Sequence, residues 1–176
     1  MSKPNTHFPE TVAAMDLGSN SFHMIVAKLE ESGTLSIIDR LRDNVRLGGG
    51  LDEHGIIDDA AQQRAFECLE TFAQRIRSLP PSAIRIAGTN TLRVATNAKE
   101  FVDKAEQILN HPIEIIAGRE EARLIYLGVA HGLATKEGKR LVVDIGGGST
   151  EFIIGRGMKP LRRESLYTGC VSASKR

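Results

Sequence analysis

Two glycine-rich turns, each entered through an aspartate, have the residue types needed to hold a chain of phosphates. Residues 16–21 have the sequence DLGSNS, and residues 144–149 have the sequence DIGGGS. Glycine lets the backbone approach a ligand closely, and successive N–H groups in such a turn form an anion-binding nest. The aspartates end their strands where magnesium or its waters could be coordinated. The N–H groups that we expect to bind phosphate belong to Gly18, Ser19, Asn20, Gly146, Gly147, Gly148 and Ser149.

These turns do not follow the common nucleotide-binding motifs. Neither contains the Gly-Lys-Ser/Thr of a Walker P-loop, and neither matches the GxGxxG of a dinucleotide site. A single such turn is ordinary, because β-hairpins need glycine for their tight backbone. Two matching turns at equivalent places in the chain favour a duplicated fold that grips a polyphosphate from both sides.

An acidic pair at the start of a predicted helix is the second candidate site. Glu120 and Glu121 lie in the sequence GREEAR at residues 118–123. Acidic residues in a first helical turn often only stabilise the helix dipole. A carboxylate there could alternatively orient and deprotonate water for attack on a phosphoryl group. The two side chains point about 100° apart on a helix, so they cannot share one role, and their positions alone do not select between them.

Arg93 is the third candidate, in the sequence GTNTLR that follows a short predicted strand. An arginine at the carboxyl end of a strand could hold phosphate in its fork of donors, although pairing with a surface carboxylate is the commoner role. The 5 histidines lack metal-ligand spacing. No Ser-His-Asp or Cys-His arrangement is discernible, so phosphate chemistry is the best-supported class.

The elements that must position these residues alternate between strands and helices. We expect strands at residues 12–16, 22–29, 35–41, 84–87, 113–116, 141–144, 151–155 and 161–167. Helices are expected at residues 97–109 and 118–132, and from Asp58 or Asp59 to about Ser78. We expect a mobile glycine-rich loop at residues 45–55, a polar turn at residues 88–92 and a charged linker at residues 136–140.

The order of these elements repeats. Three strands followed by alternating helices and strands occur once in full, and the three strands then recur after residue 140. We therefore expect a flexible leader at residues 1–10, a complete first lobe at residues 11–125 and the start of a truncated second lobe at residues 126–176. The chain would stop near the first helix of the second copy. A complete small α/β domain with a C-terminal hairpin is the alternative.

Composition narrows the class of protein. Two distant cysteines, Cys68 and Cys170, are too few for a disulfide framework and fit a reducing cytoplasm. A net charge of +1 gives no general argument for nucleic-acid binding. No apolar stretch approaches the ~20 residues that span a membrane. We predict a cytoplasmic protein with no transmembrane segment and no nucleic-acid partner, associated with a membrane at most peripherally.

The chain resembles the exopolyphosphatase and guanosine pentaphosphate phosphatase family over residues 12–171. The resemblance rests on DLGSNSFHMIVA, GTNTLRVATNAKEF, IEIIAGREEARLIYLGVAHG and VVDIGGGSTEFIIG, which occur in this order at the expected spacing. It implies an α/β fold shared with sugar kinases, actin and heat-shock chaperones. We therefore expect a ribonuclease-H-like (actin-like ATPase) lobe, with a mixed five-stranded sheet flanked by helices, followed by the first strands of a second, truncated lobe.

The resemblance also implies roles for individual residues. Glu121, the glutamate directly before Ala122, corresponds to the family's proposed general base. Asp144 and Glu151 correspond to carboxylates that act in catalysis or hold Mg²⁺ or another hard divalent cation. Arg93 corresponds to a phosphate-binding arginine, and the two turns correspond to the family's phosphate loops.

The resemblance implies a bacterial hydrolase of inorganic polyphosphate or of guanosine pentaphosphate, the latter linked to the stringent response. The second turn has glycine at position 148, as in exopolyphosphatases, whereas alanine there resembles the pentaphosphatase branch. We therefore expect the full-length protein to release orthophosphate from the end of polyphosphate. Pentaphosphate hydrolysis is the alternative, as are a kinase of the same fold and a phosphate- or nucleotide-binding module without catalysis. We expect a homodimer in full-length form, and little or no hydrolysis by these residues alone.

Overall fold

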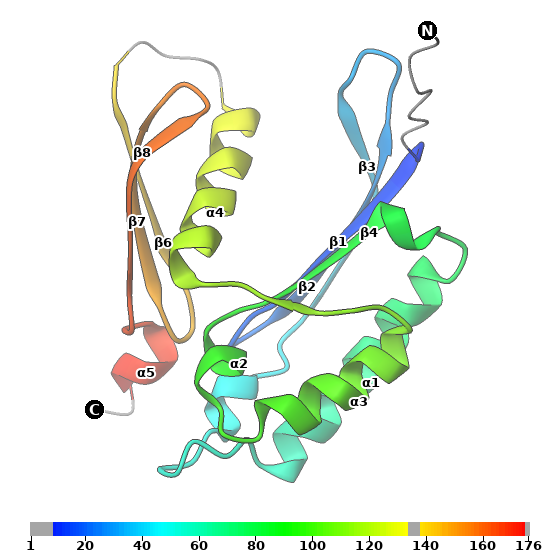
Figure 1. Ribbon diagram of the computed structural model, residues 1–176, viewed down its shortest axis with the longest axis vertical. Coiled ribbons are helices and arrows are strands. Elements are labelled where there is room, and N and C mark those ends of the chain that lie inside the picture. The colour runs from blue at the N-terminus through cyan, green and yellow to red at the C-terminus, as the bar shows by residue number, and fades with distance from the viewer. Residues whose placement is uncertain (1–8, 134–137, 175–176) are drawn as a thin grey trace, which may run out of the picture.

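The computed structural model describes residues 9–133 and 138–174. They form two β-sheets with helices packed against them (Figure 1). The larger sheet has the strand order β3-β2-β1-β4-β5, and the smaller has the order β6-β7-β8. The strands are β1 (Thr11–Leu17), β2 (Phe22–Leu29), β3 (Leu35–Asp43), β4 (Ile84–Gly88), β5 (Glu114–Ile115), β6 (Arg140–Ile145), β7 (Thr150–Arg156) and β8 (Lys159–Leu166). The helices are η1 (Leu47–Gly50), α1 (Asp59–Ile76), η2 (Pro81–Ala83), α2 (Asn90–Val94), α3 (Ala98–Leu109), α4 (Gly118–Gly132) and α5 (Cys170–Ser174).

The five-stranded sheet is mixed, as predicted. β1, β2 and β3 pair antiparallel, whereas β1 pairs parallel with β4, and β4 with β5. Side chains alternate along β1, because successive residues of a strand point to opposite faces. Met15 and Leu17 are buried in the core on one face, while Ala14 and Asp16 project from the other. The sheet therefore presents Asp16 on the face that its core does not cover.

The main hydrophobic core joins the first sheet to α1 and α3, which lie together on one face (Figure 1). The rings of Phe66 and Phe101 stack with centroids 5.1 Å apart. Burial of a side chain such as Phe101 contributes about 1.5–3 kcal/mol. Asp58 caps the start of α1 by accepting a hydrogen bond from the N–H of Ala61 at 2.6 Å. This packing holds the ends of β1 and β4 in place, where the candidate residues begin.

Helix α4 packs against the second sheet. It contributes to a separate cluster made of Ala122, Tyr126, Ala130, Val142 and Ile153. Tyr126 is fully buried, lies directly on Gly155, and donates its hydroxyl to the carbonyl of Gly157 at 3.0 Å. A boundary between residues 125 and 126 falls inside this helix. We propose instead that the two lobes divide just before Gly118, because α4 buries its apolar face on β6, β7 and β8.

Residues 45–50 of the glycine-rich segment are packed against the core, which contradicts the prediction of a mobile loop there, whereas Asp52, Glu53 and His54 are exposed. Val45 and Leu47 enter the core, and the N–H of Gly48 donates to the carbonyl of Ser19 at 2.8 Å. A Cβ at Gly50 would overlap the Ala61 side chain, so glycine here permits close approach of η1 to α1. The glycines therefore serve packing, and the segment supports the first turn from behind.

The predicted polar turn at residues 88–92 contains the short helix α2. Its backbone closes when the N–H of Arg93 donates to the carbonyl of Thr89 at 3.1 Å, and the buried Leu92 anchors it to the core. β2 and α4 match their predicted bounds, and the other predicted strands and helices lie within a few residues of theirs, whereas η1, η2 and α2 were not predicted. Residues 1–8 of the predicted leader and 136–137 of the predicted linker lie outside the described residues. Each helix that the structure describes is too short or too polar to cross a membrane.

Candidate functional site

The two Asp-led turns are β-hairpins with the same register, which confirms that they share one plan. In the first, Asp16 pairs with His23, one further pair follows, and residues 18–21 form the turn. In the second, Asp144 pairs with Glu151, one further pair follows, and residues 146–149 form the turn. The hairpins differ in the residue opposite the aspartate, which is an imidazole in one and a carboxylate in the other.

The two turns face each other closely. A Cβ added at Gly147 would lie 3.1 Å from the Cβ atoms of both Ser19 and Asn20. A Cβ at Gly148 would overlap the side-chain amide of Asn90. Glycine at both positions therefore has a steric cause, because only a residue without a side chain lets the second turn approach the first so closely.

A polar cavity of about 440 Å³ lies at this junction, and we call it the clamp cavity. Both turns line it, together with Thr89 and Asn90 at the end of β4 and three carboxylates from Asp16, Glu121 and Asp144. Hydroxyl groups stiffen the first turn: Thr91 Oγ1 donates to Ser19 Oγ at 2.7 Å, and Ser21 Oγ donates to Asn44 Oδ1 at 2.8 Å. The backbone is thus held in a fixed shape around a space of suitable size for phosphate groups.

Asp16 and Glu121 hold protons more tightly than ordinary carboxyl groups. Burial raises the pKa of Asp16 to about 6, and the negative charges of Asp144 and Glu151 add to the rise. Burial also raises the pKa of Glu121 to about 7, with the charges of Glu151 and Asp16 acting in the same direction against the lowering effect of Arg93. The negative charges of Asp16, Glu121, Asp144 and Glu151 therefore act on one another, and this mutual repulsion favours binding of a proton or a cation among them.

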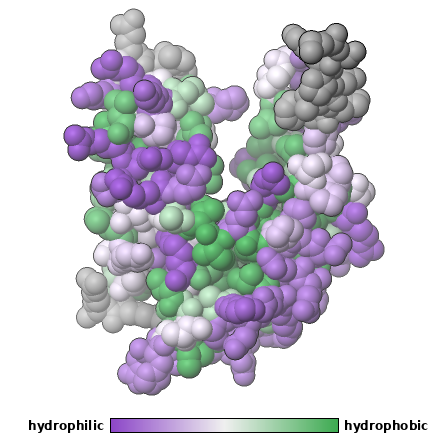
Figure 2. All heavy atoms as spheres, in the orientation of Figure 1, coloured by the Kyte–Doolittle hydropathy of each residue, from purple (hydrophilic) through white to green (hydrophobic). Residues whose placement is uncertain are grey.

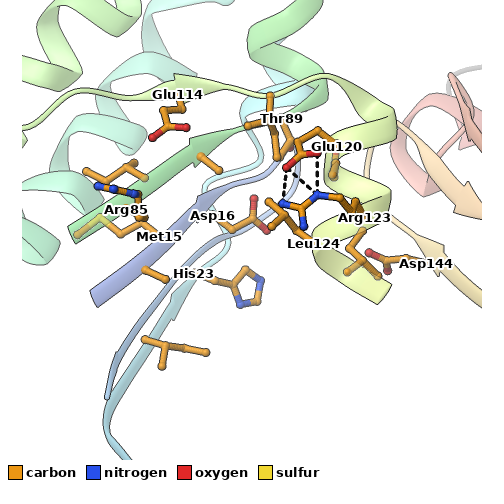
Figure 3. Close-up of a pocket in the computed structure, with 17 residues that line it drawn as sticks. Met15, Asp16, His23, Arg85, Thr89, Glu114, Glu120, Arg123, Leu124 and Asp144 are labelled. Carbon is orange, nitrogen blue, oxygen red and sulfur yellow. Dashed lines mark hydrogen bonds and ion pairs between the residues drawn. The ribbon is translucent and has the colours of Figure 1, made fainter. Parts of the chain in front are cut away.

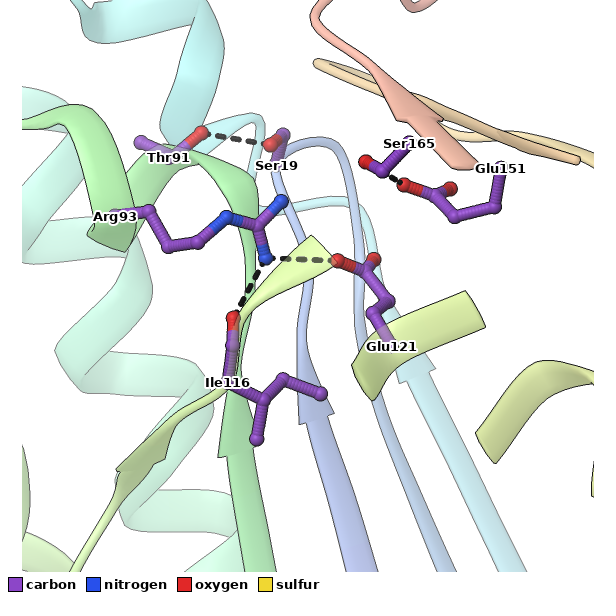
Figure 4. Close-up of polar contacts among 7 residues, drawn as sticks. All are labelled: Ser19, Thr91, Arg93, Ile116, Glu121, Glu151 and Ser165. Atoms are coloured by element: carbon purple, nitrogen blue, oxygen red, sulfur yellow. Dashed lines mark hydrogen bonds and ion pairs between the residues drawn. The ribbon is translucent and has the colours of Figure 1, made fainter. Parts of the chain in front are cut away.

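Arg93 holds Glu121 from behind (Figure 4). One guanidinium nitrogen, Nη1, donates at 2.8 Å to Glu121 Oε2 and at 2.8 Å to the carbonyl of Ile116. The side chains of Arg93 and Glu121 are only 12% and 16% exposed, so the ion pair is largely shielded from water. Arg93 does not line the clamp cavity. Among the described residues its Nε and Nη2 atoms have no hydrogen-bond partner, so part of its donor capacity is uncommitted.

The structure separates the two adjacent glutamates. Glu120 turns away to a bidentate pair with Arg123, drawn in Figure 3, with contacts of 2.7–3.1 Å. The Arg123 hydrogen bond holds the pKa of Glu120 below its ordinary value. Glu121 instead lines the clamp cavity with a pKa near neutrality. A group that exchanges protons at neutral pH is suited to act as a general base, and of the two only Glu121 has these properties.

The carboxylates form a donor set that fits a hard divalent cation only in part. Asp144 lines the clamp cavity, whereas Glu151 is 1% exposed and accepts a hydrogen bond from Ser165 Oγ at 2.8 Å (Figure 4). No group of three His, Cys, Asp or Glu side chains gathers into a metal cluster in the part of the chain that the structure describes. Magnesium is commonly held by one or two carboxylates together with waters and substrate phosphates. Asp144, with Asp16 nearby, is compatible with that mode.

A second, more apolar cavity of about 660 Å³ lies between the open face of the first sheet and α4 (Figure 3). It shares Asp16, His23, Thr89, Glu121 and Asp144 with the clamp cavity. Figure 2 shows apolar residues exposed in the hollow between the two parts of the molecule. The clamp cavity is therefore the polar end of a longer cleft.

Several residues that line the clamp cavity were not among the predicted site residues. They include His23, Arg42 and Asn90. Asn90 lies within the GTNTLR segment beside Arg93, so that motif contained its signal. His23 lies two residues after the first turn, at the position that Glu151 occupies after the second turn. This correspondence between the two hairpins could have indicated it. Arg42 has no such signal, because its place depends on the pairing of β3.

The paired hairpins and the mixed sheet define an α/β protein with the actin-like ATPase fold. The chain belongs to the Ppx/GppA phosphatase family, whose sequence profile matches residues 24–176.

Similarity to individual proteins agrees with this family. The chain is 53% identical over 163 residues to a guanosine-5'-triphosphate,3'-diphosphate pyrophosphatase from Vibrio cholerae, covering 91% of this chain and 32% of that protein. It superimposes with a TM-score of 0.87 on an exopolyphosphatase from Cytophaga hutchinsonii, at 28% identity, covering 94% of this chain and 53% of that one. An Aquifex aeolicus PPX-GPPA enzyme gives a TM-score of 0.81 at 32% identity, covering 94% and 55%. The chain spans about a third of the length of the curated relatives it matches.

Proposed function

We propose that these residues form the phosphate clamp of a guanosine pentaphosphate phosphohydrolase, which removes the terminal 5'-phosphate with water. The observation that carries the proposal is Glu121, a carboxyl group with a pKa of about 7 held by Arg93 at the wall of a glycine-lined cavity. Support for this substrate comes from the Vibrio cholerae relative, which bears the name of a guanosine pentaphosphate pyrophosphatase at 53% identity.

The proposed reaction follows from the positions of these groups. The N–H groups of the two turns bind the terminal phosphate and neutralise charge that develops on its oxygens. The exception is the N–H of Gly146, which was expected to bind phosphate but donates to the carbonyl of Ser149 at 2.9 Å. Ionised Glu121 takes a proton from water, the water oxygen bonds to phosphorus, and the bond to the bridging oxygen breaks. Orthophosphate and the shortened nucleotide then leave. A hard divalent cation held by Asp144 would supply further charge neutralisation for the phosphates.

The preference for polyphosphate that the sequence indicated rested on Gly148. The structure gives that glycine another cause, because a Cβ at this position would overlap the Asn90 side chain. Glycine at position 148 therefore reports on the contact with Asn90 and does not by itself indicate the substrate. Exopolyphosphatase activity stays the second candidate, supported by the fold similarity to the Cytophaga hutchinsonii exopolyphosphatase.

The test uses the full-length protein with two adjacent variants, Glu121→Gln and Glu120→Gln. We expect Glu121→Gln to lower kcat for guanosine pentaphosphate by about 10²–10⁴-fold, the usual contribution of a general base, while binding changes little. Glu120→Gln removes the same charge one residue away and should retain most of the activity. Equal activities in the two variants would refute Glu121 as the base. Assays with pentaphosphate and polyphosphate side by side would distinguish the two substrates.

A further inference from the structure

The clamp cavity has an unusual balance of charge for a site that binds phosphates. Three carboxylates line it, from Asp16, Glu121 and Asp144, and the one lysine or arginine among its described lining residues is Arg42. Arg93, the expected phosphate ligand, lies behind Glu121 and outside the lining. A cation and the N–H groups of the turns can serve the phosphate that reacts. The remaining phosphates of the substrate need positive charge from elsewhere.

Arg42 lies in a row of side chains across the sheet. Asp16 on β1 pairs with His23 on β2, and His23 pairs with Arg42 on β3. Paired residues of adjacent strands project from the same face, so all three side chains project toward the cleft. Adjacent strands are about 4.8 Å apart, which places the Arg42 backbone about 10 Å from that of Asp16. The row therefore runs from the acidic centre of the cavity to a cationic edge.

The Arg42 guanidinium is weakly held. Its one hydrogen bond to a described residue is a long contact of 3.4 Å from Nη2 to Ser21 Oγ. No carboxylate of the described residues lies within ion-pair distance of it, unlike Arg93 and Arg123, which are both paired with glutamates. The pKa of His23 is lowered by burial and by the charges of Arg42 and Arg40, which shows that this end of the row is positive. Arg42 thus has donors available at the edge of the cavity.

We propose that Arg42 binds a phosphate group of the substrate that is not hydrolysed, next to the terminal phosphate held by the two turns. The inference rests on the proposed function and adds a residue that selects for a chain of phosphates over a single one. A guanidinium presents a planar fork of N–H donors that matches two phosphate oxygens. Arg42 accordingly selects substrates that carry more than one phosphate in a row, whereas the two turns bind the terminal phosphate of any such substrate.

The experiment measures the binding of inorganic tripolyphosphate and of orthophosphate to this chain by calorimetry, in the presence of Mg²⁺. Arg42→Gln should weaken tripolyphosphate binding about tenfold and change orthophosphate binding less than about twofold. Arg42→Lys keeps the charge but loses the fork, so we expect a loss of about threefold. The matched control is Arg40→Gln, which removes a positive charge two residues away on the same face of β3 and outside the clamp cavity. It should change neither affinity more than about twofold.

Four outcomes would overturn the inference, and they differ in what else they refute. Unchanged tripolyphosphate binding in Arg42→Gln, with tight binding by the unsubstituted chain, would refute the role of Arg42 alone. An equal loss for both ligands, or an equal loss in Arg40→Gln, would show that Arg42 acts through the general field or through the turn at Ser21. Failure of the unsubstituted chain to bind tripolyphosphate would refute phosphate binding by the two turns of this chain together with this inference.

Discussion

Replacing Arg93 by glutamine should raise the pKa of Glu121 above its value of about 7. Arg93 Nη1 lies 2.8 Å from Glu121 Oε2, and the two side chains are 12% and 16% exposed. A pair of unit charges about 4 Å apart in such surroundings interacts by up to about 4 kcal/mol, and about 1.4 kcal/mol corresponds to one pH unit. Measured arginine effects on neighbouring carboxyl groups are about one to three pH units, which is the range we expect here.

The sign of the effect on activity follows from the proposed role of Glu121. A base acts only when ionised, so activity rises with pH through its pKa. With a pKa of about 7, roughly half of the enzyme is active at pH 7. A rise of about two pH units would leave roughly one molecule in a hundred active at pH 7, with recovery above pH 9. The acidic limb of the pH profile of Arg93→Gln should therefore move to higher pH. The limb of Arg93→Lys should lie between those of Arg93→Gln and the unsubstituted protein.

Two measurements check this prediction. The pH profile of kcat in the full-length protein reports the base in the substrate complex, and carbon NMR titration of the Glu121 carboxyl group reports it in this chain without substrate. If Arg93 instead contacts substrate phosphate directly, Arg93→Gln will raise KM and leave the acidic limb where it is. An unmoved limb together with an unmoved NMR titration would refute the positioning role.

Two further changes test the electrostatics and the packing. Asp16→Asn removes a charge that raises the pKa of Glu121, so the NMR titration of Glu121 should move to lower pH, opposite to its movement in Arg93→Gln. Movement to higher pH would contradict the mutual repulsion of these carboxylates. Gly155→Ala places a methyl group into the Tyr126 ring and should destabilise the protein by about 1–3 kcal/mol, whereas Gly128→Ala in α4 meets nothing within 4 Å and should stabilise it by about 0.5–1 kcal/mol. Urea denaturation of both variants measures the difference, and equal effects would contradict the described packing of α4 on β7.

Local sequence signals were sufficient for much of the fold. The bounds of β2 and α4 were predictable because a turn or a glycine marks each end and the apolar spacing inside is regular. The two turns could be matched to each other because both repeat the same order of aspartate, glycine and hydroxyl residues. The family resemblance then added the expected fold of the whole lobe.

Features that depend on tertiary contacts were not predictable in this way. Glycines at residues 48–50 indicated a mobile loop. In the structure, Gly48 and Gly50 are instead places where a side chain would collide with Ser19 and Ala61, which pack against them. The sequence also did not show that Arg93 lies behind Glu121, since the two are 28 residues apart and their side chains meet only in the folded chain.

The position of Arg42 depends on one irregularity. Counting outward from the pair Leu29–Leu35 without interruption would place Leu41 opposite His23. A bulge between Val26 and Ala27 shifts the register by one residue and places Arg42 there instead. A shift of one residue moves a side chain to the other face of the sheet, so this bulge decides whether an arginine borders the cavity.

In the proposed function the two turns hold the same phosphate from opposite sides. Backbone amide NMR of this chain, titrated with tripolyphosphate in the presence of Mg²⁺, tests it directly. The amide signals of residues 18–20 and 146–149 should move together with one common dissociation constant. Movement of only one turn, or movement of the two turns with different dissociation constants, would contradict the claim.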